Sequence, residues 1–126
     1  MSFDWNKYFD LAVDLRKTNE EAYIRSAISR SYYCAFNTAK YYLKAKNRDV
    51  NTVNHDQLWS QVRSVSGNLE IQVLGQRVKR LRKMADYDSV FPKIDSELVI
   101  AMVNTTQILQ LLKGFDHKPD VPSPKL

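Results

Sequence analysis

Apolar residues recur along this chain at steps of three and four, the spacing that places side chains on one face of a helix. The pattern predicts five helical segments, which cover residues 5–15, 19–47, 54–65, 69–87 and 95–113. The longest segment carries a core stripe made of Ile24, Ala27, Ile28, Ser31, Tyr32, Ala35, Ala39 and Leu43. The sequence therefore predicts an all-α fold, an antiparallel up-and-down bundle of four to five helices with short connections.

Residues that commonly begin or end helices stand at the borders of these segments. Those expected to do so here are Thr18 with Glu21, Asn54 with Gln57, Asn68, Asp95 or Ser96, and finally Gly114. In each of the two pairs, Thr18 with Glu21 and Asn54 with Gln57, the side chain of one residue would accept a hydrogen bond from the backbone amide of the other. This reciprocal arrangement is the capping box.

The length of 126 residues suits one domain. Hydrophobic residues make up 44% of the chain and charged residues 26%, a balance typical of globular proteins. We expect residues 1–115 to form the bundle. Residues 116–126 (DHKPDVPSPKL) are expected to form a proline-rich flexible tail.

Composition excludes several kinds of site. The single cysteine, Cys34, allows no internal disulfide framework, suits a reducing cytoplasm and is expected to be an inert buried thiol. Two histidines are too few for a His-rich metal centre, and no Gly-rich phosphate loop, HExxH or GxSxG occurs. The sequence predicts neither a metal nor a cofactor. It has no signal peptide pattern and no apolar run long enough for a membrane span, so we expect a cytoplasmic protein without a membrane partner.

Basic residues suggest a polyanionic partner. The formal net charge is +5, and residues 77–83 (RVKRLRK) place five basic side chains in seven positions. On the long helix, a polar face opposite the apolar stripe carries further candidates. The predicted nucleic-acid-binding residues are Arg30, Asn37, Arg77, Lys79, Arg80 and Lys83. The alternative for Lys79, Arg80 and Lys83 is an ordinary solvated helix face.

Arg82 and Asp86 are four residues apart, so their side chains can pair on one helix face and hold the guanidinium in a fixed orientation. The alternative is a surface ion pair that contributes a few tenths of a kcal/mol. The tyrosines of the long helix are expected to serve packing in the core and in interfaces.

Three stretches together resemble the HEPN family (higher-eukaryote and prokaryote nucleotide-binding). Residues 26–37 (SAISRSYYCAFN) are similar to the family's AxSRxYYAxFH helix, and residues 81–88 (LRKMADYD) to its LRxxADYD segment. Asn54-His55 resembles the start of the family's third helix. The resemblance covers nearly the whole chain. It implies a four- or five-helix bundle, frequent homodimers, and a role in defence, toxin–antitoxin or nucleotide-linked systems.

The resemblance also implies a comparison with the family's metal-independent ribonucleases, which use an Arg followed after four to six residues by a His. No histidine stands in that window after Arg77, Arg80 or Arg82. Tyrosine, with a pKa of about 10, and aspartate, with one of about 3.9, are poor bases at neutral pH. The residues that remain as catalytic candidates are Arg82, Asp86, Tyr87 and His55, the last if it folds back beside Arg82.

Three hypotheses for the function follow. The first is a homodimeric HEPN-like module that binds RNA or a nucleotide-linked partner. The second is a ribonuclease, such as a toxin, that uses Arg82 with an unusual base. The third is a structural adaptor or antitoxin subunit whose helices bind a partner protein, for example one encoded by a neighbouring gene. The sequence leaves open whether the protein is an enzyme.

Overall fold

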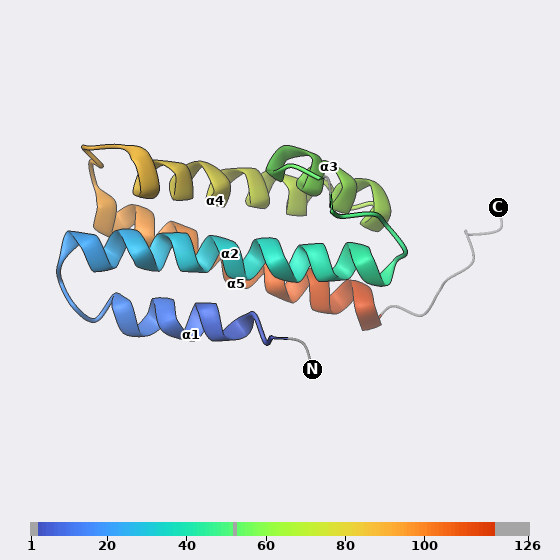
Figure 1. The fold of residues 1–126 in the computed structure, drawn as a ribbon, viewed down its shortest axis with the longest axis horizontal. Coiled ribbons are helices and arrows are strands. Elements are labelled where there is room, and N and C mark those ends of the chain that lie inside the picture. The colour runs from blue at the N-terminus through green and yellow to red at the C-terminus, as the bar shows by residue number, and fades with distance from the viewer. Residues whose placement is uncertain (1–2, 52, 118–126) are drawn as a thin grey trace.

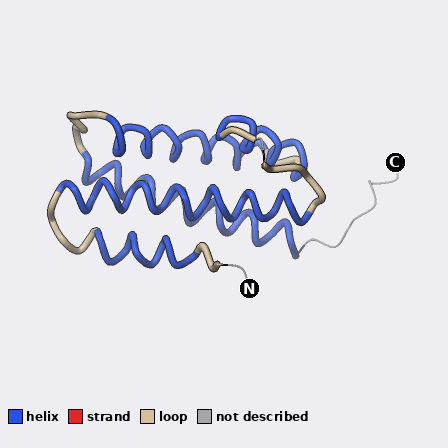
Figure 2. Tube along the Cα trace, in the orientation of Figure 1, coloured by secondary structure: helices blue, strands red, loops and turns tan. Residues whose placement is uncertain are grey.

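The structure is a computed structural model that describes residues 3–51 and 53–117. Within these residues it contains no strand and five helices: α1 (Asn6–Leu15), α2 (Glu21–Ala45), α3 (His55–Ser66), α4 (Leu69–Tyr87) and α5 (Ile94–His117). Short loops join them (Figure 2). Sequential long helices run in opposite directions, and the short α3 lies against the first half of α4 (Figure 1). The predicted all-α bundle is confirmed.

Helix α2 lies at the centre of the bundle and contacts each of the other four helices. Its predicted stripe is buried throughout, with Ile28, Tyr32 and Leu43 fully inaccessible to solvent. Cys34 is a free, buried cysteine, and burial raises the pKa of its thiol to about 11. Side chains on α2 therefore have packed neighbours on several sides.

Two predicted caps are confirmed. The Asn54 side chain accepts a hydrogen bond from the Gln57 amide at 2.8 Å, and the Gln57 side chain accepts one from the Asn54 amide at 3.1 Å. This capping box fixes the first turn of α3, which carries His55. At the start of α4, Asn68 accepts a hydrogen bond from the Ile71 amide at 3.0 Å.

Two predicted helix starts are wrong. The Thr18 hydroxyl donates to the Leu15 carbonyl at 2.7 Å, so it closes α1 instead of pairing with Glu21 at the start of α2. Helix α5 begins at Ile94, before Asp95 and Ser96, because Lys93 turns the chain with a φ of 57°. Asp95 lies in the first turn, where a negative charge suits the helix dipole.

Gly114 was also expected to end α5, but the helix continues through it to His117. Packing explains the extension, since the next residue, Phe115, lies with its ring 5.7 Å from the ring of Tyr42. The predicted tail therefore overlaps the helix at residues 116 and 117. Residues 118–126 lie outside the described part of the chain.

Helix α5 has the length and apolar composition of a membrane span over Ile94–Phe115, although the sequence has no unbroken apolar run of that size. This is weak support for a membrane helix, because core helices of soluble bundles share these properties. Here α5 packs on α2 and α4, and its Ala101, Ile108 and Leu112 are buried.

Two contacts hold α4 in place. At Gly75 the backbone of α4 lies directly against the indole ring of Trp59, so closely that an added Cβ would overlap the ring. At the other end, the Arg25 guanidinium donates to backbone carbonyls of Met84, Ala85 and Asp88 at 3.3, 3.0 and 2.6 Å. Arg25 thus satisfies carbonyls that the end of a helix leaves without partners.

Candidate functional site

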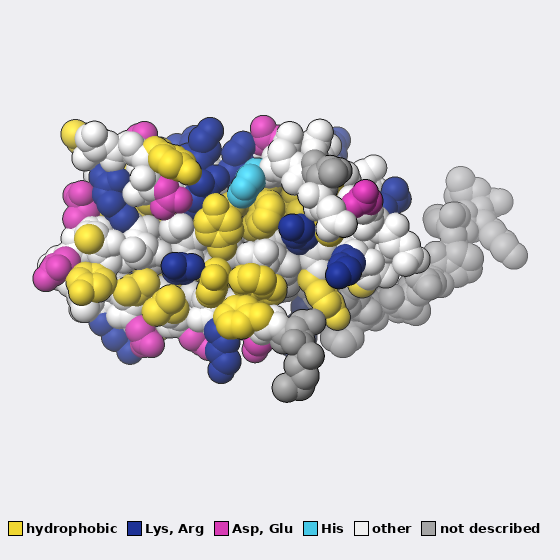
Figure 3. All heavy atoms as spheres, viewed as in Figure 1, with side chains coloured by type: hydrophobic (Ala, Val, Ile, Leu, Met, Phe, Trp, Pro, Cys, Tyr) yellow, Lys and Arg dark blue, Asp and Glu magenta, His cyan; other side chains and the backbone are white. Residues whose placement is uncertain are grey.

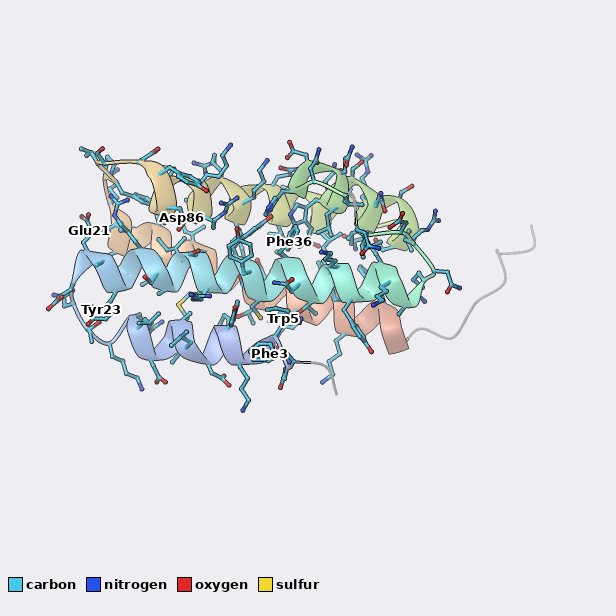
Figure 4. The ribbon with its side chains drawn as sticks, viewed as in Figure 1. Phe3, Trp5, Glu21, Tyr23, Phe36 and Asp86 are labelled. Atoms are coloured by element: carbon cyan, nitrogen blue, oxygen red, sulfur yellow. The ribbon has the colours of Figure 1, made fainter. Side chains whose placement is uncertain are left out.

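Arg82 occupies the boundary between α2 and α4. It is only 6% exposed, and its guanidinium carbon lies 5.4 and 5.5 Å from the ring centres of Tyr32 and Tyr33 on α2. Asp86, one turn later on α4, places a carboxylate oxygen 3.5 Å from the guanidinium (Figure 4). Tyr87 contributes a third ring at 6.0 Å. The expected pair of Arg82 and Asp86 is therefore present, within a set of aromatic rings.

The guanidinium of Arg82 has a hydrogen-bond donor without a partner among the described residues. This donor is its buried Nε–H. Arginine stays protonated at any physiological pH, so the charge is permanent. The aromatic faces compensate part of this charge by cation–π attraction.

His55, the first residue of α3, lies against the same part of α2. Its Nδ1 is 2.7 Å from the Tyr32 hydroxyl, and the Phe36 ring stacks on the imidazole with 4.4 Å between ring centres. Figure 4 shows Phe36 projecting from α2 toward α3 and α4. Tyr32 contacts both His55 and Arg82, so one tyrosine links two of the predicted site residues.

Burial, and next the positive charge of Arg82, lower the pKa of His55 below its ordinary value of 6.5. Burial also raises the pKa of Tyr32 well above its usual range, although a hydrogen bond from Trp59 and the charge of Arg82 oppose the shift. At neutral pH the site therefore holds a neutral imidazole and a protonated phenol beside a permanent cation.

The outer face of α4 is basic. Lys79, Arg80 and Lys83 line an open hollow of about 430 Å³ together with Tyr87, whose side chain is 74% exposed. Lys79 forms an ion pair with Asp56 of α3, and this pairing lowers the pKa of Asp56. On the face drawn in Figure 3, Lys and Arg side chains lie along α4, and an apolar band on α2 runs beside a histidine.

The other predicted binding residues lie elsewhere. Arg30 packs on α1, with its guanidinium 4.8 Å from the ring centre of Tyr8. The Asn37 side chain donates to the Tyr33 carbonyl of its own helix at 2.9 Å. Arg77 faces α5, where it donates to Asn104 at 3.1 Å. All three have partners within the fold, and the structure does not gather them around Arg82.

Two residues of the site, Tyr32 and Trp59, were not among the predicted site residues, and Tyr32 was expected only in the core stripe of the long helix. Both are fully buried, and the Trp59 indole N–H donates to the Tyr32 hydroxyl at 3.2 Å. The signal was present in the sequence, because a buried tyrosine or tryptophan needs a partner for its polar atom. The sequence could not say which helix would supply it.

The arrangement suits binding of an anion. Three cations of α4, Lys79, Arg80 and Lys83, line the hollow against one carboxylate, Asp88, and the exposed ring of Tyr87 also lines it. No group of three or more His, Cys, Asp or Glu side chains that could hold a metal ion occurs in residues 3–51 and 53–117.

Comparison with known proteins agrees with the geometry at the level of family. The model of the HEPN domain matches residues 6–114, which include every helix except the last three residues of α5. No curated protein and no solved structure matches the chain. Because the match covers most of the chain, this protein belongs to the HEPN domain family.

Proposed function

We propose that this HEPN domain is a cytoplasmic RNA-binding module that forms a homodimer and works in a defence or toxin–antitoxin type of system. One observation carries the proposal: Lys79, Arg80 and Lys83 line a single hollow on α4 beside the exposed ring of Tyr87. The buried cation of Arg82 lies directly behind that ring.

The basic side chains of the hollow and the Tyr87 ring match two parts of single-stranded RNA, its phosphates and its bases. Phosphates attract the Lys and Arg side chains, and binding releases the counterions that surround a nucleic acid. A base can stack on the Tyr87 ring, a contact that tolerates any base because every base has a π face. The Arg82 guanidinium, paired with Asp86, lies 6.0 Å from the Tyr87 ring centre and adds a positive charge beneath this stacking surface.

Replacing both Arg80 and Lys83 with alanine should weaken binding of a fluorescent single-stranded RNA at least tenfold at low salt. The variant should also have a smaller dependence of affinity on salt, by about one unit of log–log slope for each lost phosphate contact. Fluorescence anisotropy across a salt series measures both quantities. Neither side chain is buried, so the fold should be retained.

The matched control removes two exposed lysines on other helices, Lys7 of α1 and Lys113 of α5. It changes the net charge by the same amount and should leave the slope unchanged. Equal losses in the two double variants would mean that net charge, not the α4 hollow, controls binding. No binding by the wild type at low salt would exclude RNA as the ligand.

Exposed apolar side chains on α5 support the homodimer. Val99, Ile100 and Val103 are 54%, 39% and 50% exposed, and their spacing places them on one side of the helix. Burying such side chains against a second copy would remove apolar surface from water, which favours association.

Val103→Glu is expected to convert a dimer into a monomer of about half the mass, because the interface would have to bury a charge. The chain mass is 14.7 kDa, so light scattering distinguishes the two states directly. Ser60→Glu on α3 introduces the same charge at an exposed position of another helix and should leave the dimer intact. A wild type that stays monomeric at high concentration would contradict this part of the proposal.

A further inference from the structure

Three aromatic side chains form a chain of hydrogen bonds from the core to the candidate site. The Trp59 indole nitrogen lies 3.2 Å from the Tyr32 hydroxyl, which in turn lies 2.7 Å from Nδ1 of His55. Trp59 and Tyr32 are fully buried, and they come from α3 and α2. His55 stands at the outer end and is half-buried.

From this chain we infer that Trp59 and Tyr32 hold His55 in one tautomer, with Nδ1 accepting from Tyr32 and the proton on Nε2. His55 then offers a hydrogen-bond donor, and not a base, to a phosphate bound on α4 near Arg82. The second statement rests on the proposed RNA-binding function, whereas the first depends only on the fold.

The direction of the two hydrogen bonds follows from what each group can do. An indole N–H only donates, so Trp59 uses one lone pair of the Tyr32 oxygen. The hydroxyl has a single hydrogen, and within the described residues the only acceptor in reach of it is Nδ1 of His55. If Nδ1 carried the proton instead, the buried hydroxyl hydrogen would lose its acceptor, which costs its full desolvation penalty.

The charged groups around His55 favour its neutral form. A positive charge on His55 is disfavoured by three cations, Arg82 and Lys79 on α4 and Lys40 on α2. Asp56 on α3 has the opposite effect, but it is paired with Lys79. Burial acts in the same direction as the three cations. Tyr32 keeps its hydrogen, since burial disfavours the phenolate.

Ring contacts also fix the orientation of the His55 imidazole. Phe36 stacks on the imidazole at 4.4 Å with 27° between the ring planes, and Tyr32 lies nearly parallel to it at 5.6 Å. A flipped imidazole would turn a carbon toward the Tyr32 hydroxyl and lose the hydrogen bond. Tyr32 is thus a positioning residue that acts through His55.

This tautomer has a chemical consequence. A general base needs a free lone pair within reach of the proton that it removes. In His55 the Nδ1 lone pair already accepts from Tyr32, and Nε2 carries a hydrogen. His55 can therefore strengthen phosphate binding beside Arg82, but it cannot take the proton from a ribose hydroxyl in this state.

The test is long-range proton–nitrogen NMR of protein labelled with ¹⁵N-histidine, at a pH above 7. The coupling pattern identifies which ring nitrogen carries the proton, and His117→Gln assigns the two histidines. We expect a single Nε2–H tautomer for His55 in the wild type. An Nδ1–H tautomer, or a mixture of the two, would overturn the inference.

Two tyrosine variants separate the hydrogen bond from general packing. Tyr32→Phe should release the tautomer and give an averaged pattern, whereas Tyr33→Phe should leave the wild-type pattern. Tyr33 is the matched control because its ring also lies near His55, at 6.2 Å and edge-on. If Tyr32→Phe does not fold, the wild-type spectrum still decides the question.

RNA binding then tests the donor role. His55→Ala should bind single-stranded RNA at least about tenfold more weakly, as expected for one lost hydrogen bond to a charged group, whereas His55→Gln retains a donor and should lose less. Cleavage of RNA in EDTA by the wild type that His55→Ala abolishes would overturn the donor role. A wild type with the Nε2–H tautomer that binds no RNA would leave the tautomer standing and reject the proposed function.

Discussion

Gly75→Ala is expected to lower the free energy of unfolding by about 1–3 kcal/mol, the usual cost of forcing an extra carbon into a packed core. The Cβ would overlap the Trp59 ring, which is fully buried, so the ring or the backbone of α4 would have to shift within the core. Alanine otherwise favours a helix over glycine by about 1 kcal/mol, so the clash has to exceed this gain. Urea denaturation followed by circular dichroism measures the difference.

Gly114→Ala is the matched control, because it makes the same substitution inside α5, where nothing lies within 4 Å of the added carbon. It should stabilise the protein by up to about 1 kcal/mol. If both variants were stabilised equally, the close approach of Trp59 to α4 would be refuted. Gly75→Ala should also disturb the hydrogen bond from Trp59 to Tyr32, and with it the tautomer of His55.

Arg25→Met is expected to cost about 2–4 kcal/mol, since hydrogen bonds from a charged group contribute about 1.5–3 kcal/mol each and are not additive. The variant keeps the length of the side chain but leaves the carbonyls at the end of α4 without their donor. It also removes the guanidinium from its position 5.9 Å from the Phe91 ring centre. Thermal and urea unfolding would both report the loss.

The free energy of unfolding of Arg25→Lys should lie between those of the wild type and Arg25→Met. The lysine ammonium keeps the positive charge but lacks the planar guanidinium that donates to several carbonyls at once. Arg48→Met controls for the loss of an arginine at an exposed position and should change stability by less than about 0.5 kcal/mol. Equal effects at positions 25 and 48 would show that the contacts of Arg25 with α4 contribute nothing.

The sequence predicts most of the fold because helical periodicity is a local property. The stripe on α2 from Ile24 to Leu43 is buried as expected, and the capping box of Asn54 and Gln57 forms because both partners lie within one turn. The helix ends that fail are those decided by distant packing. Gly114 stays inside α5 because Phe115 packs against Tyr42, a residue more than seventy positions earlier.

The candidate site is harder to predict from the sequence than the fold, for the same reason. The pair of Arg82 and Asp86 was predictable, since four residues separate them on one helix. The positions of Tyr32, Trp59 and His55 around Arg82 depend on how α2, α3 and α4 meet, which periodicity does not specify. Arg30 and Asn37 illustrate the opposite case, because they were predicted to share the polar face of the long helix but find partners on α1 and on their own backbone.

The central place of α2 in the bundle bears on the entropy of ligand binding. The partly buried rings of Tyr33 and Phe36 project from a helix that four neighbours already immobilise, so these side chains lose their rotamer freedom when the chain folds. A ligand that meets such preorganised rings loses little further conformational entropy on association. The long side chains of Arg80 and Lys83, in contrast, remain exposed and would have to be ordered by the ligand itself.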